Sequence, residues 1–143
     1  MTTAEQLTLV FNNNFVAYFR SHAAHVNITG RNFRSDHKLL GGVYERRQAE
    51  IDKIGEILRT MQEVMPFNLQ DVIADSTIPT DAIEGSADEL LEAVMMDLEH
   101  LLNDFKELIV IASDEELEEI SNYAQDQALD LEKSIWMLRS TLE

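Results

Sequence analysis

The sequence predicts an all-α fold, a bundle of four long helices with one short extra helix. Apolar residues recur with the 3.6-residue period of an α-helix along almost the whole chain. Proline and glycine, which are frequent in loop-rich β folds, number only 2 and 5 among 143 residues. Both prolines lie within residues 66–83, the only long break in the periodicity. A chain of this length is expected to form a single domain over residues 1–143.

The first two helices are expected over residues 3–28 and 32–65. Their apolar stripes consist of Leu7, Val10, Phe11, Tyr18, His22 and His25 in the first helix, and of Phe33, Leu40, Tyr44, Ile51, Ile54, Leu58 and Met61 in the second. Gly30 is placed to end the first helix and Pro66 to end the second. A short helix is expected at residues 69–74, inside the long connection.

The last two long helices begin at predicted caps. Ser86 is followed by two acids in the first turn, and Ser113 opens a predicted capping box. The stripes consist of Leu90, Leu91, Val94, Leu98, Leu101, Leu102, Phe105, Leu108 and Ile109, and then of Leu117, Ile120, Ala124, Ala128, Leu131, Ile135 and Leu138. Trp136 lies near the last stripe and is expected to pack. Four helices of about 26 residues or more, two short turns and one long crossover predict a four-helix bundle.

Composition excludes several classes of function. Cysteine is absent, so disulfides, thiolate metal sites and cysteine nucleophiles are excluded, and metal binding must use His, Asp and Glu. No apolar run is long enough for a membrane span, and the first residues lack the basic, then apolar pattern of a signal peptide. These observations predict a cytoplasmic protein without a membrane partner.

The net charge of −16 is unevenly distributed along the chain. Residues 1–62 carry 8 basic and 6 acidic residues, whereas residues 63–143 carry 3 basic and 21 acidic ones. Affinity for nucleic acid comes largely from Lys and Arg side chains that neutralise phosphates. The charge therefore disfavours nucleic acid as a partner and favours cations.

Two imidazoles and two carboxylates, His25, His37, Asp52 and Glu56, form the ligand mixture expected for ferrous iron or a similar divalent metal. His37 and Asp52 are about 22 Å apart along one helix, so no ion can bridge them within one chain. Asp52 and Glu56 share a face that points away from the subunit's own apolar stripe. Either these acids form a solvated helix face, or they meet His25 and His37 of a second subunit across a two-fold axis.

Two further features bear on that choice. Gly41 lies on the same side of its helix as His37 and Asp52, which favours close approach of a second subunit over a simple local bend. Asp97 and His100 form an acid-x-x-His pair of the kind used in di-iron bundles. Only one such pair occurs in the chain, so His100 is interpreted as a surface histidine.

Acidic residues crowd the start of the last helix. They are Asp114, Glu115, Glu116, Glu118 and Glu119. Complementation of the helix dipole accounts for the first three. Glu118 and Glu119 lie deeper than that effect reaches, and a channel that attracts cations is the alternative interpretation.

Two segments carry a resemblance to a known family. One is the histidine-rich segment 22–37, which is followed by Tyr44, Asp52 and Glu56, and the other is the closing segment 131–139. Together they resemble the Dps family of miniferritins, ferritin-like proteins that protect DNA in starved cells. The resemblance covers nearly the whole chain and includes the short helix in the crossover.

The resemblance implies a ferritin-like bundle that assembles as a hollow homo-dodecamer. It implies a ferroxidase centre between two-fold-related subunits, with His25 and His37 from one chain and Asp52 and Glu56 from the other. Ferrous iron would be oxidised, typically with hydrogen peroxide as acceptor, and stored inside as a ferric mineral. Such a protein would protect the cell against oxidative damage.

The resemblance also implies iron-entry pores near the start of the last helix, where Asp114 and Glu118 fall at or near the acidic positions. The chain departs from the family in three ways. Val26 stands where a tryptophan is usual, and Gly41 stands where a further acid is usual, with Glu45 a candidate substitute one turn on. The lysine-rich tail with which some members bind DNA is missing, which implies that this chain does not bind DNA.

Two competing hypotheses stay open at this point. The first is a metal-sequestering or structural cage whose catalytic centre has decayed, which Gly41 and Val26 would explain. The second is a monomeric helical-bundle adaptor, whose particle would weigh about as much as the 16.3 kDa chain.

Overall fold

A computed structural model describes all 143 residues and contains only helices. Four are long and one is short, as the sequence predicts. Their bounds are Thr3–Asn27 for α1, Phe33–Thr60 for α2, Leu69–Asp75 for α3, Ala87–Asp114 for α4 and Glu118–Leu142 for α5. The all-α four-helix bundle with a short helix in its crossover is therefore confirmed.

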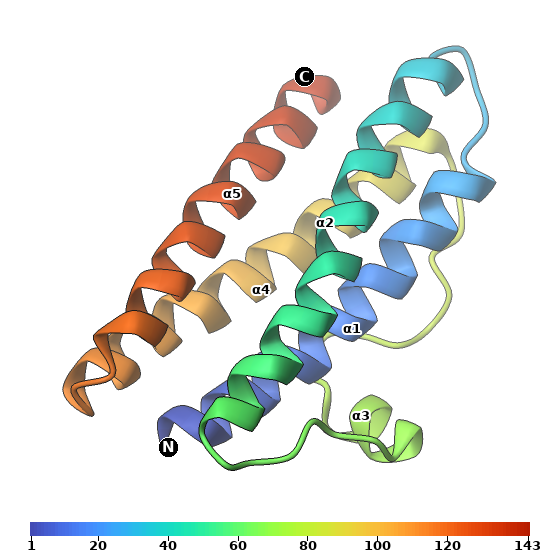
Figure 1. Cartoon of the computed structure of the whole chain (residues 1–143). Helices are drawn as coiled ribbons and strands as arrows, with labels where there is room; N and C mark the ends of the chain where they lie inside the picture. Colours follow the sequence, from blue (N-terminus) through green and yellow to red (C-terminus); the bar gives the residue numbers. More distant parts are fainter.

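The topology pairs two antiparallel hairpins through one long crossover. Figure 1 shows α1 and α2 side by side, and α4 and α5 side by side, with α3 in the connection that returns the chain to the other end of the bundle. The two hairpins join mainly where α1 packs on α4, and α2 meets α5 over only a short stretch. Because the crossover runs the length of the bundle, α2 and α4 are parallel.

One hydrophobic core runs through the bundle and draws on every helix. Most of its members come from the predicted stripes, and Phe105 is the largest fully buried apolar side chain. The stripes omit eight core residues, which are Val16, Ala17, Ala24, Ile28, Val43, Val72, Ile78 and Ala112. Trp136 is an exception, because its side chain is 57 % exposed. The prediction that Trp136 packs in the core is wrong within a single chain, since Ile135 and Leu138 fill the core positions of that turn.

Of the two helix starts predicted from capping signals, the one at Ser86 is correct and the one at Ser113 is wrong. Ser86 caps α4, and its side chain and that of Glu89 each bond the other's backbone N–H. Ser113, by contrast, lies inside the last turn of α4, and α5 begins at Glu118 after the N-cap Leu117. The Ser113 hydroxyl bonds the Glu118 carboxylate across the turn instead.

Helix α2 ends at Thr60, five residues before the predicted end. The cause is a left-handed residue, Gln62, whose φ of 64° stops the helix. The chain then folds back, so that the Met65 side chain occupies the space beside Gly55, where a Cβ would lie 2.8 Å from the Met65 sulfur. Gly55 thus accommodates the start of the crossover.

Helix α1 ends before Gly30, the residue that was expected to end it. Helix α1 ends at Asn27, and its C-cap Ile28 is extended and buried. Gly30 lies further along the turn with a φ of 122°, a conformation that L side chains rarely adopt. Gly30 therefore shapes the turn between the two helices. None of the helices has an apolar stretch that could cross a bilayer.

Candidate metal centre

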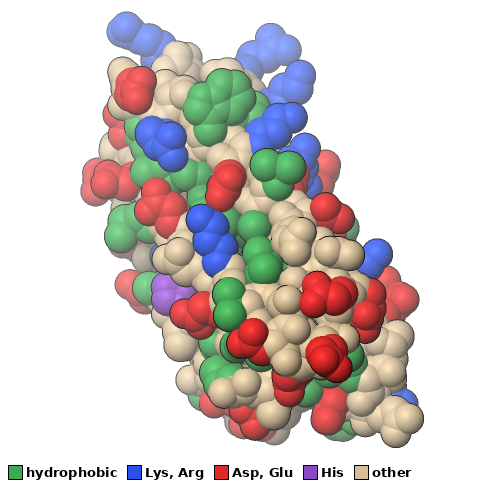
Figure 2. All heavy atoms as spheres, turned by 90° about the vertical axis from the view of Figure 1, so that its left-hand side faces the viewer, with side chains coloured by type: hydrophobic (Ala, Val, Ile, Leu, Met, Phe, Trp, Pro, Cys, Tyr) green, Lys and Arg blue, Asp and Glu red, His purple; other side chains and the backbone are tan.

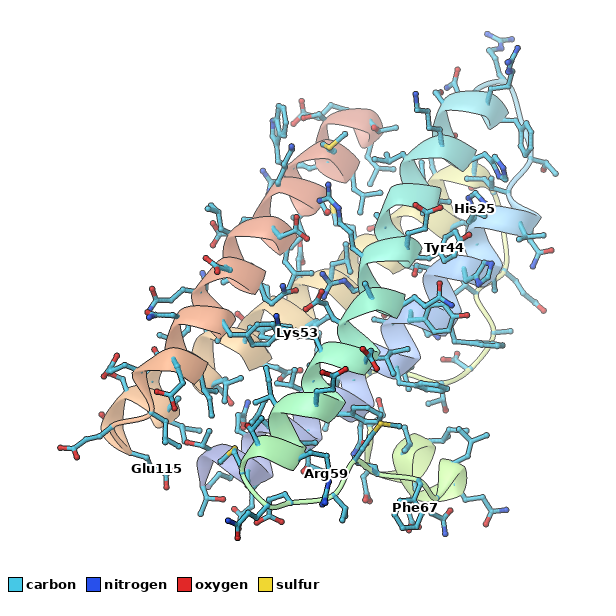
Figure 3. The ribbon with its side chains drawn as sticks, in the orientation of Figure 1. His25, Tyr44, Lys53, Arg59, Phe67 and Glu115 are labelled. Atoms are coloured by element: carbon cyan, nitrogen blue, oxygen red, sulfur yellow. The ribbon has the colours of Figure 1, made fainter.

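His25 and His37 are brought together where the end of α1 packs beside the start of α2. Their rings stack with centroids 3.8 Å apart and planes inclined by 16°. Each ring is tied to the backbone of the other residue: His25 Nδ1 lies 2.6 Å from the His37 carbonyl oxygen, and His37 Nδ1 lies 2.7 Å from the His25 carbonyl oxygen. Figure 3 shows His25 between the two helices, beside Tyr44.

These two bonds identify Nδ1 as the hydrogen-bond donor of each ring. A carbonyl oxygen can only accept, so each Nδ1 must carry the proton and donate it. In the neutral ring the lone pair then resides on Nε2, and neither Nε2 makes a hydrogen bond within the chain. An imidazole whose Nδ1–H is held by a backbone carbonyl is oriented as metal-binding histidines usually are. The pair therefore offers two oriented nitrogen donors.

Gly41 makes this arrangement possible. A Cβ at Gly41 would lie 3.1 Å from His25 Cε1 and 3.3 Å from His25 Nδ1, whereas one at Gly42 would meet nothing within 4 Å. The space beside Gly41 is thus filled by a ring of the same chain. The interpretation that Gly41 admits a second subunit is wrong in its cause, because the close approach is internal to the hairpin.

Asp52 and Glu56 lie one turn apart on α2, and both are exposed. Their carboxyl groups are adjacent, and the hydrogen bond with Asp52 and its nearby charge raise the pKa of Glu56. Two carboxyl groups this close offer oxygen donors of the kind that divalent cations accept. Glu45, the candidate substitute ligand, is also exposed on α2.

The chain on its own does not unite the four predicted ligands. No group of three or more His, Asp or Glu side chains is placed to hold a metal ion. The two imidazoles lie at one end of α2, and the two carboxylates lie about four turns further along it. The protein thus presents two half-sites, one of nitrogen donors and one of oxygen donors.

The rival pair, Asp97 and His100, has other partners. Asp97 is buried, and its Oδ2 accepts a 2.7 Å bond from the Arg20 guanidinium. His100 Nε2 lies 2.8 Å from the Thr77 hydroxyl and 3.9 Å from Asp104. Because the two side chains engage different groups, they do not form a metal-binding pair, and His100 is partly exposed as expected.

The acidic cluster lies on the turn between α4 and α5. Asp114 and Glu118, the predicted pore residues, are both exposed there. Glu115 is bonded by the backbone N–H and the hydroxyl of Thr3, which lowers the pKa of its carboxyl and ties the start of α1 to this turn. Figure 3 labels Glu115 at this end of the bundle. Figure 2 shows most of the visible Lys and Arg side chains toward one end of this side of the molecule, and Asp and Glu side chains scattered over its whole length.

Two features of the interior were not predicted from the sequence. Tyr18, His22 and Tyr44 continue the ring stack of the histidine pair, with His22 and Tyr44 stacked 3.9 Å apart. Arg47 is buried inside the bundle, where its guanidinium bonds the Asn14 and Gln127 side chains. The spacing of Tyr18 and His22, one helical turn apart, could have indicated their contact. Nothing in the apolar pattern indicates a buried arginine.

The structure thus defines a bundle of four long helices that carries an imidazole pair and, further along α2, a separate carboxylate pair. The family described as Ferritin-like domain matches residues 4–143. The chain is 27 % identical to the DNA protection during starvation protein of Helicobacter pylori, over 99 % of each chain. Among solved structures it is similar to CAIP of Helicobacter cinaedi, with 28 % identity, a TM-score of 0.92 and coverage of 99 % and 100 %. It is similar to a Dps protein of Bacillus brevis, with 25 % identity, a TM-score of 0.93 and coverage of 99 % and 95 %.

The chain belongs to the ferritin-like family and, within it, to the Dps miniferritins. The predicted resemblance to the Dps family is thereby confirmed. Membership of this family supports a general role in iron storage and protection.

Proposed function

We propose that the protein is a ferroxidase of the Dps type, whose metal site forms between two copies of the chain. In this proposal His25 and His37 of one subunit and Asp52 and Glu56 of its two-fold partner bind ferrous iron. The iron is oxidised by hydrogen peroxide and stored as ferric mineral in a hollow homo-dodecamer. The protein acts in the cytoplasm and does not bind DNA.

The observation that carries the proposal is the reciprocal bonding of His25 and His37. It leaves the Nε2 atoms of both rings oriented and without a hydrogen-bond partner in the chain, and ferrous iron accepts imidazole and carboxylate ligands together. The exposed Asp52–Glu56 pair supplies the matching carboxylates, and the hydrogen bond and the charge of Asp52 raise the pKa of Glu56, as expected for two adjacent acids. Each half-site lacks what the other provides, so a symmetric dimer completes two sites at once.

The proposed chemistry uses each residue in a defined role. The imidazoles hold the ion by Nε2 while the backbone carbonyls keep their rings in place. The carboxylates offset the charge that grows when Fe²⁺ becomes Fe³⁺. Two ferrous ions together supply the two electrons that convert one hydrogen peroxide and two protons into two waters. A route that delivers electrons in pairs avoids release of hydroxyl radical.

The primary test is ferrous oxidation by hydrogen peroxide in wild type and in the His25→Ala/Asp52→Ala variant. We expect the double variant to lose its initial rate, since each change removes one ligand from every site. The matched control, His100→Ala/Glu92→Ala, also removes one imidazole and one exposed carboxylate, and it should oxidise iron at the wild-type rate. Unchanged oxidation in the His25→Ala/Asp52→Ala variant would refute the assigned ligands.

A mixing experiment tests the location of the site between subunits. A His25→Ala/His37→Ala chain and an Asp52→Ala/Glu56→Ala chain are each expected to be inactive alone. When equal amounts are unfolded and refolded together, every mixed dimer regains one intact site, so activity should recover to about a quarter of wild type for random pairing. No recovery, in assemblies shown by mass spectrometry to be mixed, would place the site elsewhere.

Gly41 favours a second candidate, a cage that binds ferrous iron without oxidising it. The side chain absent at Gly41 could have supplied a further carboxylate beside His25. The two candidates differ in a single measurement, because the cage would bind ferrous iron rapidly under anaerobic conditions and leave it ferrous after peroxide is added. Under the leading proposal, oxidation is slow or limited to one iron per site.

A further inference from the structure

A continuous series of aromatic rings leads away from the histidine pair along the α1–α2 contact. Successive ring centroids are 3.8 to 6.2 Å apart, so each ring touches the next. From the metal-binding pair inward, the rings are those of His37, His25, Tyr44, His22, Tyr18 and Phe15. Figure 3 shows His25 and Tyr44 adjacent in the gap between the two helices.

Within this series Tyr18 and His22 form a hydrogen-bonded pair. The Tyr18 hydroxyl lies 3.2 Å from His22 Nδ1, and both side chains are partly buried. With the phenol as donor, Nδ1 is the acceptor of a neutral imidazole. Tyr44 is nearer to His25, but its hydroxyl makes no hydrogen bond within the chain. Tyr123 lies outside the series and donates to Glu50.

This pairing distinguishes Tyr18 chemically from the other tyrosine of the series. A phenol that loses an electron becomes strongly acidic and must release its proton at the same time. An imidazole is the side chain best suited to take that proton near neutral pH. Tyr18 has such an acceptor in place, whereas Tyr44 has none, so Tyr18 is the ring of this series at which oxidation is easiest.

Electron counting creates a need for such a residue. When one ferrous ion occupies a site alone, two imidazoles and two carboxylates suffice to hold it, and no second ion is there to give an electron. A single ferrous ion gives one electron, but hydrogen peroxide must take two to become water. If iron alone reacted, the peroxide would split into hydroxide and hydroxyl radical.

Resting on the function proposed above, we propose that Tyr18, paired with His22, is the redox-active residue that supplies the second electron. One ferrous ion and the Tyr18 phenol each lose an electron, and the peroxide O–O bond breaks. The phenolic proton moves to His22 Nδ1, and two protons from solvent complete two waters. The products are ferric iron, a neutral tyrosyl radical and a protonated His22. A later ferrous ion then reduces the radical, and His22 returns the proton to the phenol.

The test is freeze-quench electron paramagnetic resonance after one ferrous ion per site meets hydrogen peroxide. Wild type should give a tyrosyl radical signal, identified because ring-deuterated tyrosine narrows it. Tyr18→Phe keeps the ring and its packing but should lose the signal, and a spin trap should then capture hydroxyl radical. His22→Phe keeps the stacking without the proton acceptor, so its signal should fall as well.

Tyr44→Phe and Tyr123→Phe are the matched controls, since each removes one hydroxyl elsewhere, and both should keep the signal. An undiminished signal in Tyr18→Phe, or loss of the signal in Tyr44→Phe alone, would overturn the assignment. If wild type oxidises iron without forming any radical, the inference fails while the proposed function stands. If wild type does not oxidise iron at all, both fail.

Discussion

Two adjacent glycines in α2 have different surroundings. A Cβ at Gly41 would lie 3.1 Å from the His25 ring, close enough that the ring would have to shift, whereas Gly42 faces open space. Glycine inside a helix is unfavourable by about 1 kcal/mol relative to alanine. At Gly42 nothing in the chain offsets that cost, but at Gly41 the absence of a Cβ is what lets the two histidine rings stack.

We therefore expect opposite outcomes for alanine at these two positions. Gly42→Ala should raise the free energy of unfolding by up to about 1 kcal/mol and leave iron oxidation unchanged. Gly41→Ala should gain little stability, because the new methyl group displaces His25, and it should slow iron oxidation. Thermal unfolding and the peroxide-dependent oxidation rate measure both effects. Equal rates for the two variants would show that the position of the His25 ring does not matter.

Asp104 is a buried acid whose environment disfavours its charge. Burial raises the pKa of its carboxyl, and the charge of Glu107 acts in the same direction, although the Asn13 bond and His100 oppose it. A carboxyl with a raised pKa in the folded state stabilises the protein at low pH. That contribution is lost as pH rises from the unfolded pKa through the folded pKa.

Asp104→Asn should therefore stabilise the protein at neutral pH by about 1 kcal/mol, and by less near pH 4. Asparagine can still accept the bond from Asn13, so the packing is retained. Melting temperatures between about pH 4 and 7 test this dependence, with the exposed Asp126→Asn as control. A gain of the same size at every pH would mean that charge is not its cause.

The sequence predicts the histidine pair but not its geometry. The spacing of His25 and His37 predicts two donors on adjoining helix ends, and both are found there. The bonds from each Nδ1 to a backbone carbonyl depend on how the two helices are placed side by side, which periodicity does not specify. The exposure of Trp136 was missed for a related reason, since a residue at the margin of a stripe can face either the core or the solvent.

Among the helices, α1, α2 and α4 begin within one residue of the predicted positions, whereas the start of α5 and the end of α2 each differ from the prediction by five residues. Ser86 and Glu89 form a capping box, a hydrogen-bond pattern that can be recognised from four consecutive residues of the sequence. The ends of α2 and α4 depend on Gln62 and Glu116, which adopt left-handed φ values of 64° and 62° although neither is glycine. Residue type gives no signal there, because glycine is the usual choice for that conformation.

Gln62 thus predicts a stabilising substitution at the end of α2. Gln62→Gly should raise the free energy of unfolding by up to about 1 kcal/mol, since glycine adopts this backbone conformation without the Cβ penalty. Gln62→Ala retains the Cβ and should bring no gain. Chemical denaturation of the three proteins measures the difference. A variant with glycine that is no more stable than the one with alanine would contradict this account.

For the whole molecule, the crossover presents an apolar surface to solvent. Phe67 is 87 % exposed, and Val64 and Leu69 beside it are more than half exposed. Figure 3 shows Phe67 beside the short helix α3. Exposed apolar patches of this kind commonly mark contacts between proteins. We interpret this patch as part of the surface on which copies of the chain associate.

Phe67→Ser should therefore weaken assembly without unfolding the bundle, because Phe67 lies outside the core. Native mass spectrometry should find wild type near 196 kDa, the mass of twelve 16.3 kDa chains, and Phe67→Ser in smaller species. Gln70→Ser changes an exposed residue of the neighbouring helix α3. It is the control and should assemble as wild type does. A wild-type particle of monomer mass would instead support the adaptor hypothesis.

The mutual bonds of His25 and His37 have a consequence for engineering. Each ring is oriented by the backbone carbonyl of the other histidine, and the His25 ring lies against Gly41, which has no side chain. The stretch from the last turns of α1 to the first turns of α2 therefore contains all that its donor geometry requires. Transplanted into an unrelated antiparallel helical hairpin, this short cassette would bring a ready pair of nitrogen donors, and a designer would have to supply only the facing carboxylates.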